Sequence, residues 1–366
     1  MDTIASMNSK QRVAVIGAGL AGATCARTLR LAGHAVHVFE KSRGPGGRLA
    51  TRRIEWVDGD GRPCTTRIDH GALAITARSG AFRAFVDDCT RAGWLAEWHA
   101  IAADNSLPID DGGPRHLPVP EWPALCRELL QGIDATWSFT VDGLHRGPRG
   151  WQVLARGEAA PTTFDAVVLA LPPAQAAPLL GPHRHDWARQ AAIVPMEPCW
   201  TLMGVADDAA PQTWDIARPP TGPLAWVLRS DARPGRLRMA GQAMWVAHAR
   251  ASWSRRHLER PATWVQQQMQ GALADWLARP VDWQHCIVHR WRYATPTPRK
   301  AAPALSCWWD AALGLGVCGD FLGSTGIEGA WLSAKSLAAS MLRCRAHAAA
   351  AEAAAATGDA DRHLVT

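Results

Sequence analysis

The sequence predicts an α/β chain with a doubly wound parallel sheet and an inserted lobe built on an antiparallel sheet. Three observations predict this class. Residues 12–39 follow the pattern of a strand, a glycine-rich turn, a helix and a second strand, which opens a βαβ unit. Residues 164–171 form an apolar run of the kind found in buried parallel strands. A third apolar run, at residues 313–318, supplies one more strand near the end of the chain.

The first elements are marked by apolar runs that end in glycine. A strand at residues 12–16 runs into glycines, and residues 22–32 have a helical composition that Gly33 closes as a C-terminal signal. A second strand follows at residues 35–39. The chain therefore begins as strand, helix, strand.

Later elements carry similar signals. In the run at residues 164–171 only Asp165 is polar, and the run stops at Pro172. The last helix shows apolar residues at helical spacing. We expect loops at residues 110–120 and 218–223, strands at 242–249, 285–293 and 313–318, and helices at 259–277 and 327–343.

Two units are expected, because 366 residues exceed the usual size of one domain. We assign three separate segments to the first domain and two to the lobe, and we expect both chain ends to be disordered. The first domain takes residues 12–75, 130–175 and 305–345, the lobe takes 76–129 and 176–304, and the disordered ends are 1–11 and 348–366.

Composition excludes several classes of protein. The chain is 48% hydrophobic and 20% charged, which predicts a folded globular protein. It has no run of 18 uncharged apolar residues and no signal-peptide pattern at its start, so we expect no membrane span and a cytoplasmic location. The net charge of +6 comes almost wholly from arginines scattered among acidic residues. That distribution favours a solvated surface over nucleic-acid binding.

The sequence gives little support to metal or thiol chemistry. The nine cysteines form no Cys-x-x-Cys pair, which excludes a thioredoxin-like motif and the usual zinc ribbons. His285 and His289 are four residues apart, but the residues between them favour a strand, on which the two side chains lie about 13 Å apart. We therefore expect no metal site. No Gly-x-Ser-x-Gly motif suggests a serine hydrolase.

The glycine-rich turn is the main functional motif. Gly17, Gly19 and Gly22 match Gly-x-Gly-x-x-Gly between a predicted strand and a predicted helix. In that setting the first glycine allows a tight turn, the second lets the backbone approach a pyrophosphate, and the third allows close helix packing. Glu40 ends the second strand, where an acidic side chain accepts hydrogen bonds from an adenosine ribose. The sequence therefore predicts a dinucleotide site.

The segment after Glu40 favours FAD over a nicotinamide dinucleotide. A glycine-rich bend leads to Arg48, which would bring a cation back towards the phosphates. A second match to the glycine pattern, at residues 314–319, lies too near the chain end for another nucleotide-binding domain and is interpreted as a terminal strand. Asp320 would then present a carboxylate to the ribityl or pyrophosphate part of the flavin. The expected fold is thus a Rossmann-like FAD-binding domain with an inserted substrate lobe.

Further segments share their residues with one known family. They are residues 13–22, 40–53, 69–72, 319–320 and 328–333, together with the interior segments 167–172, 198–200, 246–249, 253–254 and 289–294. In these segments the chain resembles the bacterial renalase-like flavoproteins of the wider amine-oxidase and p-hydroxybenzoate-hydroxylase-like FAD group. The resemblance covers roughly residues 12–345.

The resemblance implies a noncovalent FAD and an oxidase that takes a hydride from a reduced pyridine-type substrate. Electrons would pass to O2 and give H2O2. The family's known substrates are dihydro isomers of nicotinamide nucleotides. Cofactor binding is expected at the family positions Gly17, Gly19, Gly22, Glu40, Arg48, Asp320 and Glu328, and also at Ala18, Leu20, Lys41, Gly47, Val141 and Gly329.

His248 and Trp291 match family positions that face the substrate, and we expect them to be the catalytic residues. Each has a second interpretation as a packing residue of a sheet. The chain also departs from the family at residues 73–75, where Leu-Ala-Ile replaces the common Gln-Tyr-Phe. This change removes polar and aromatic groups expected near the flavin, so the substrate can differ from the family's.

Two alternative functions remain open. A flavin amine oxidase would commonly hold its amine between two tyrosines and place a lysine near the flavin, but Tyr293 is the only tyrosine and Lys300 the only candidate lysine. A flavin-binding protein without turnover is the second alternative. The hydride-oxidase hypothesis requires positioning rather than a strong acid or base, which suits a sequence without an evident catalytic dyad. A small-molecule substrate and O2 are expected as partners, nucleic acid and a membrane are not, and the sequence does not indicate an oligomeric state.

Overall fold

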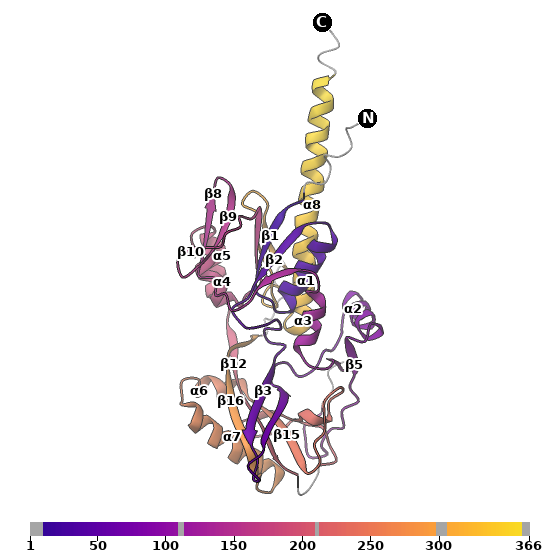
Figure 1. Cartoon of the computed structure of the whole chain (residues 1–366), viewed down its shortest axis with the longest axis vertical. Helices are drawn as coiled ribbons and strands as arrows, with labels where there is room; N and C mark the ends of the chain where they lie inside the picture. The colour runs from indigo at the N-terminus through magenta and orange to yellow at the C-terminus, as the bar shows by residue number, and fades with distance from the viewer. Residues whose placement is uncertain (1–9, 109–112, 209–211, 298–305, 361–366) are drawn as a thin grey trace.

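The computed structural model describes residues 10–108, 113–208, 212–297 and 306–360, with side chains as far as Arg343. Figure 1 shows two units that follow one another along the long axis of the molecule. One contains the parallel sheet with helices on its faces, and the other contains the antiparallel lobe. The fold class predicted from the sequence is confirmed.

The larger sheet has six strands. Five of them are parallel, and the edge strand at residues 308–310 runs antiparallel to its neighbour at residues 315–317. The strands predicted at residues 12–16 and 35–39 are confirmed, whereas those at 164–171 and 313–318 are shorter than predicted. In spatial order the strands are β17 (Trp308–Asp310), β18 (Leu315–Val317), β11 (Ala166–Leu169), β1 (Arg12–Ile16), β2 (Ala35–Phe39) and β7 (Asp134–Thr136).

Both faces of this sheet are covered, which explains its continuous apolar strands. Side chains alternate along β1, so that Val13 and Val15 join one core cluster while Ala14 and Ile16 join another. The first cluster includes α1 (Leu20–Leu31), α3 (Pro123–Leu129) and α8 (Gly326–Ala360). The second includes α4 (Pro173–Leu180), α5 (His185–Ala192) and part of the sheet of β8 (Gly143–Gly147), β9 (Gly150–Ala155) and β10 (Glu158–Ala159).

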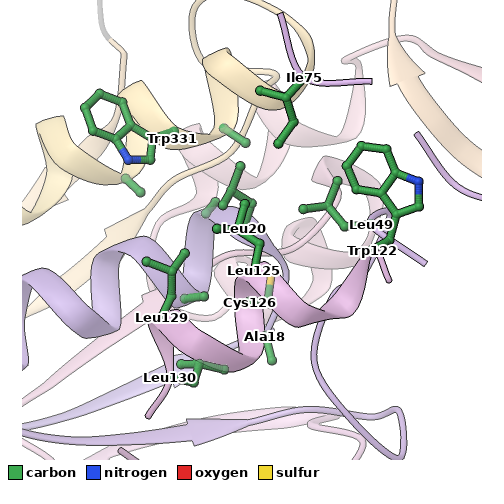
Figure 2. Packing of buried hydrophobic residues seen from close by; sticks show 14 of the residues in the cluster. Ala18, Leu20, Leu49, Ile75, Trp122, Leu125, Cys126, Leu129, Leu130 and Trp331 are labelled. Carbon is green, nitrogen blue, oxygen red and sulfur yellow. The ribbon is translucent and has the colours of Figure 1, made fainter. Parts of the chain in front are cut away.

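Figure 2 shows the first cluster beside the start of α1. Leu20 lies next to Leu125 and Cys126 of α3, while Trp331 of α8 and Ile75 approach from other segments. Burying a leucine or isoleucine side chain stabilises the fold by about 1.5–3 kcal/mol. The cluster therefore fixes the N-terminal end of α1 in place.

The lobe is a five-stranded antiparallel sheet with helices on one face. Val265 and Met269 of α7 pack with Leu202 and Trp245 of the sheet. The predicted strand at residues 242–249 is confirmed, and the helix predicted at 259–277 begins at Ala262. The strands are, in order, β13 (Ile216–Ala217), β14 (Leu224–Arg229), β15 (Gln242–Ala249), β12 (Met196–Asp207) and β16 (Trp283–Pro296), and the helices are α6 (Ala251–Arg256) and α7 (Ala262–Leu277).

Some segments lie against a different unit from the one we assigned them to. The hairpin of β3 (Thr51–Val57) and β4 (Pro63–Asp69) packs on the lobe, where Trp56 Nε1 donates a hydrogen bond to Gln284 Oε1 at 3.2 Å. In contrast, α2 (Gly80–Arg91) packs against α8. Apolar periodicity shows that a face is buried but does not show which element covers it. Short elements complete the chain: β5 (Leu95–Glu97), β6 (His116–Pro118) and the 3₁₀ turn η1 (Ser230–Ala232).

The C-terminal segment differs from the sequence-based expectation. We expected disorder from residue 348, but α8 continues to Ala360, because alanine has the highest helix propensity of all residues. At the other end, the Ala35 amide donates to the Gln11 carbonyl at 2.8 Å, so Gln11 is ordered. Residues 1–9 and 361–366 lie outside the described residues. No helix in the described part of the chain combines the length and apolar composition needed to cross a bilayer.

Candidate functional site

A cavity of about 1120 Å³ lies at the carboxyl ends of the central parallel strands. Gly17 follows β1, Glu40 follows β2, Ala170 follows β11 and Gly319 closely follows β18, and all four residues line the cavity. This edge is where open α/β sheets bind their ligands. The volume exceeds that of most small-molecule sites and is large enough for a dinucleotide.

The glycine turn shows which glycines the protein itself requires. A Cβ on Gly22 would lie 1.9 Å from the Gly17 carbonyl oxygen, and one on Gly17 would lie 2.6 Å from that of Ala170. A Cβ on Gly19, in contrast, would meet no protein atom nearer than 3.9 Å. Gly19 lines the cavity and precedes α1, whose first amides have no side-chain cap. The missing side chain of Gly19 therefore leaves room for an anionic ligand at a helix N-terminus.

Glu40 is held in a defined orientation beside this turn. Its side chain is buried, and its two oxygens accept hydrogen bonds from the Ala18 and Ser42 amides, each at 2.8 Å. A carboxylate has further lone pairs on both oxygens. Glu40 can therefore accept ribose hydroxyls without giving up either amide.

Arg48 is paired with a carboxylate from the other end of the chain. Its guanidinium donates two hydrogen bonds to Asp320, both at 2.7 Å, and one to the Ala294 carbonyl at 3.1 Å. Asp320 is 3% exposed and Arg48 is about one-third exposed. We expected Arg48 to meet a pyrophosphate directly. In the structure it ties together the glycine bend, the end of β16 and the segment after β18.

Most of the predicted site residues line the cavity, but five do not. Glu328 is one of these five: its carboxylate accepts the Arg78 and Ser79 amides at 2.9 and 2.8 Å and so holds the start of α2 against α8. Gly329 allows close packing at the start of α8. The lining residues are Gly17, Gly19, Leu20, Glu40, Lys41, Gly47, Arg48, Val141, Trp291 and Asp320, and those outside are Ala18, Gly22, His248, Glu328 and Gly329.

Strand β16 supplies an aromatic part of the cavity wall. His289, Trp291 and Tyr293 alternate along the strand and all line the cavity. The His70 ring lies nearly parallel to the Trp291 ring at 5.2 Å, and the His289 ring meets Trp291 edge-on at 4.4 Å. Trp291 Nε1 donates to the His70 carbonyl at 3.2 Å. Sequence reasoning identified Trp291 but missed His70 and His289, although the alternation on a predicted strand was a usable signal for His289.

His248, on β15, lies outside the cavity lining and close to His70. Burial lowers the pKa of His70 to about 3, with the neighbouring His289 and Arg52 adding to the effect. Burial and the charge of Arg233 lower the pKa of His248 to about 4. His70 Nδ1 and His248 Nε2 are buried without a hydrogen-bond partner in the described part of the chain. The wall is therefore backed by neutral imidazoles with unused hydrogen-bonding capacity.

Replacing His70 with phenylalanine should reduce the loss of stability in acid. The unfolded chain binds a proton at His70 below its ordinary pKa of 6.5, while the folded chain binds it only near pH 3, so folding stability falls as the pH drops between these values. Between pH 6.5 and 4.5 we expect the wild type to lose about 2–3 kcal/mol more than His70→Phe. Urea unfolding at both pH values measures the difference.

The control for that experiment is His99→Asn, which removes an exposed histidine whose side chain is 83% accessible. Its stability should follow the pH as the wild type's does. An identical acid response in His70→Phe and in the wild type would contradict the lowered pKa.

The positions where the chain departs from the resembling family lie outside the cavity lining. Ile75 is fully buried and pairs with His116, while Leu73 and Ala74 pack against the first core cluster. Lys300, the lysine considered for an amine oxidase, lies outside the described residues. Within the described residues, no group of three histidine, cysteine or acidic side chains could hold a metal.

Residues 15–89 match the family model of the NAD(P)-binding Rossmann-like domain. Solved structures that superpose on nearly the whole chain include a putative protoporphyrinogen oxidase from Exiguobacterium sp. 255-15, with a TM-score of 0.68 and 12% identity over 92% of this chain and 99% of that chain. Cyclohexylamine oxidase from Brevibacterium oxydans IH-35A has a TM-score of 0.60 and 13% identity, over 91% of this chain and 99% of that one. The chain has the amine oxidase fold.

One curated relative shares a higher identity over a shorter stretch. The tRNA 5-methylaminomethyl-2-thiouridine biosynthesis bifunctional protein MnmC of Magnetococcus marinus is 30% identical over 206 residues. The match covers 46% of this chain and 30% of the relative's length. In this chain the amine oxidase fold joins a dinucleotide-binding domain to an antiparallel lobe, and the cavity takes residues from both.

Proposed function

We propose that the chain is an FAD-dependent, renalase-like oxidase that takes a hydride from a small dihydropyridine-type substrate and passes electrons to O2. The observation that carries the proposal is one continuous cavity with dinucleotide-binding features at the strand ends and an aromatic wall on β16. Bound FAD would accept the hydride and reduce O2 to H2O2. The names of two structural relatives, a protoporphyrinogen oxidase and an amine oxidase, agree with oxidation chemistry.

The residues of the cavity divide into a set that would bind the cofactor and a set that would face the substrate. Gly19 and the N-terminus of α1 would take the pyrophosphate, and Glu40 would take the adenosine ribose. Asp320, with its charge balanced by Arg48, would lie beside the rest of the cofactor. These features support FAD as the ligand, because a long cavity at the strand ends suits a dinucleotide.

Trp291 would provide a flat surface against which a planar ring lies, with His289 at its edge. A dihydropyridine needs correct placement and no removal of a proton by the protein, so neutral imidazoles are sufficient. A flavin amine oxidase is the alternative, favoured by the name of cyclohexylamine oxidase. Tyr293 is the only tyrosine in the chain, so a pair of tyrosines cannot hold the amine.

Purified protein should be yellow, and acid precipitation should release free FAD. Anaerobic stopped-flow mixing with α- and β-NADH, their 2- and 6-dihydro isomers and simple amines should show which compounds bleach the flavin. We expect a dihydronicotinamide to react at least about tenfold faster than any amine, a difference of ~1.4 kcal/mol in barrier. Trp291→Ala should slow the reaction more than it weakens FAD binding. Trp264→Ala, on the far face of the lobe sheet, is the matched control.

Three outcomes of this experiment would change the proposal. A colourless protein that added FAD cannot saturate removes the cofactor assignment. Rapid bleaching by an amine, with no reaction of any dihydropyridine, replaces the proposal with the amine-oxidase alternative. Bleaching by dithionite alone favours a flavin-binding protein without turnover.

A further inference from the structure

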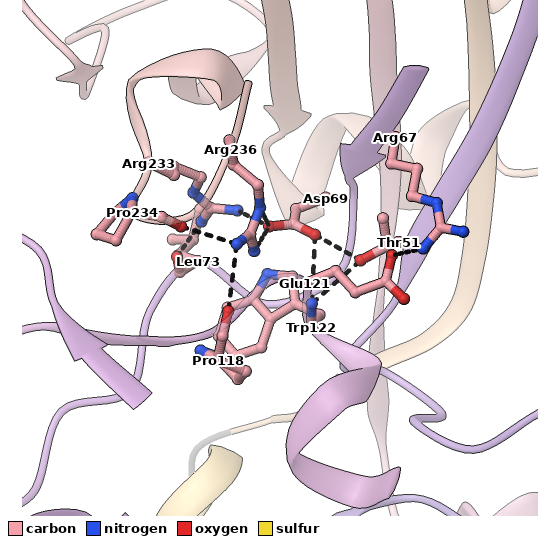
Figure 3. A network of polar contacts seen from close by, with 10 residues as sticks. All are labelled: Thr51, Arg67, Asp69, Leu73, Pro118, Glu121, Trp122, Arg233, Pro234 and Arg236. Carbon is pink, nitrogen blue, oxygen red and sulfur yellow. Dashed lines mark hydrogen bonds and ion pairs between the residues drawn. The ribbon is translucent and has the colours of Figure 1, made fainter. Parts of the chain in front are cut away.

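Asp69, at the end of β4, is the centre of a buried ion network (Figure 3). Its Oδ2 accepts hydrogen bonds from Arg233 Nη1 at 3.2 Å and Arg236 Nε at 3.0 Å. Its Oδ1 accepts from the Thr51 hydroxyl and, at 3.4 Å, from the Trp122 amide. The side chains of Arg233 and Arg236 are 2% and 6% exposed, so all three charges are shielded from water.

Two guanidinium groups share this single carboxylate. Arg236 Nη2 also donates to the Asp69 carboxylate, and its Nη1 donates to the carbonyls of Pro118 and Pro234 at 3.2 and 2.9 Å. Arg233 lies over the Trp98 ring at 5.2 Å. Buried charges of this kind are often no more stable than apolar residues of similar volume. The network therefore requires an explanation besides stability.

Arg233 contacts both ends of one short turn, residues 69–73. It donates to the Asp69 carboxylate at the first residue and to the Leu73 carbonyl at the last. On its other side the same turn is held by the residues just before β3. The His70 amide donates to the Ala50 carbonyl at 3.0 Å, and the Ala72 amide donates to the Arg48 carbonyl at 3.1 Å. The turn is thus fixed from two directions.

His70 lies inside this turn and connects it to the cavity wall. Its carbonyl accepts the Trp291 indole N–H, and its ring lies 5.2 Å from the Trp291 ring at an angle of 26°. The position and tilt of Trp291 therefore depend on the backbone and the ring of His70. Trp291 lines the cavity, whereas Asp69, Arg233 and Arg236 do not.

We propose that Arg233 and Asp69 are positioning residues that fix the 69–73 turn and, through His70, the orientation of Trp291 in the cavity wall. The proposal rests on the proposed function in one respect, that the Trp291 ring is the surface against which substrate lies. The position of the ring itself is independent of any substrate. A ring misplaced by about 1 Å can slow a reaction by as much as a hundredfold.

The test uses the FAD-loaded full chain labelled with 5-fluorotryptophan and read by ¹⁹F NMR. The signal lost in Trp291→Phe identifies Trp291. In Asp69→Asn and Arg233→Met this signal should move by more than its line width or broaden, because the turn is released. Arg233→Lys keeps the positive charge, but an ammonium group cannot reach both ends of the turn as the guanidinium of arginine does. The Trp291 signal of Arg233→Lys should therefore lie between those of Arg233→Met and the wild type.

Arg184→Met is the matched control, because Arg184 also donates two hydrogen bonds to one carboxylate, that of Asp186 at 2.9 and 2.7 Å, and lies beside α5 in the first domain rather than next to Arg233 in the chain. Its Trp291 signal should stay in place. If the Trp291 signal is unchanged in Asp69→Asn and in whichever Arg233 variant folds, the proposal is wrong. Movement of the signal in Arg184→Met as well would show a general loss of structure and would equally overturn it.

Kinetics then separate this inference from the proposed function. With the dihydronicotinamide that best reduces the wild type, Arg233→Met should slow flavin reduction about tenfold to a hundredfold at saturating substrate, with little change in FAD affinity. If no dihydronicotinamide reduces the wild type, the proposed function fails, and the ¹⁹F result still decides whether the network positions Trp291.

Discussion

Replacing Gly22 with alanine should prevent FAD binding and destabilise the first domain. The new methyl carbon would lie 1.9 Å from the Gly17 carbonyl oxygen, and a backbone atom cannot turn aside as a flexible side chain can. Helix α1 would have to move away from the turn that holds its N-terminus. Overpacking of this kind costs about 1–3 kcal/mol and occasionally more. Urea unfolding of the apoprotein and titration with FAD measure the two losses.

Gly19→Ala is the informative partner to that variant. The nearest protein atom would lie 3.9 Å from its Cβ, so folding should be unaffected. A pyrophosphate brought close to this backbone would meet the methyl group, and FAD affinity should fall by at least about tenfold, or ~1.4 kcal/mol. Gly44→Ala, with no atom within 4 Å of its Cβ, should match the wild type in both measurements. Normal FAD affinity in Gly19→Ala would mean that the cofactor does not approach the turn.

Arg48→Ala should weaken FAD binding by about 3 kcal/mol or more, because it removes one member of a pair whose other member is buried. The Asp320 carboxylate, 3% exposed, would lose its counterion beside an anionic cofactor. Removing both side chains should be less damaging than removing Arg48 alone. A double-mutant cycle of FAD dissociation constants for Arg48→Ala, Asp320→Ala and the double variant measures this coupling.

Additive effects in that cycle would point to a different role for Arg48. They would mean that Arg48 contacts the pyrophosphate independently of Asp320, as the sequence alone suggested. Asp320→Asn is a milder control, because it keeps the volume and one hydrogen-bond acceptor while removing the charge.

The nucleotide-binding half of the fold could be predicted because its signals are local. The strand, the glycine turn and the helix lie within twenty residues of one another, and Glu40 follows at the end of the next strand. Each residue type has a steric or hydrogen-bonding reason to be there. Glu328, which holds the start of α2 against α8, was assigned by resemblance rather than by a local physical argument.

The contacts that define the rest of the cavity are not local. Arg48 meets Asp320 across 272 positions, and Trp291 meets His70 across 221. No periodicity in the sequence encodes such a meeting, because it depends on how β16 leaves the lobe and reaches the first domain. The same holds for the packing of α2 against α8, two helices far apart in the chain.

The pairing of strands β12 and β16 determines how the aromatic wall is held. Their pairing runs from Met196 and Pro296, near the cavity, to Ala206 and Trp283 at the far end of the lobe, with register shifts between Glu197 and Cys199 and between Val205 and Ala206. Separating these two strands would leave buried backbone hydrogen bonds unmade, and each of them costs about 1–3 kcal/mol. Trp291 pairs with Cys199 on the lobe side of the first shift, so the aromatic wall is held as part of the lobe sheet. We expect the Trp291 backbone to keep its place in that sheet during substrate exchange, while side chains and loops at the mouth of the cavity move.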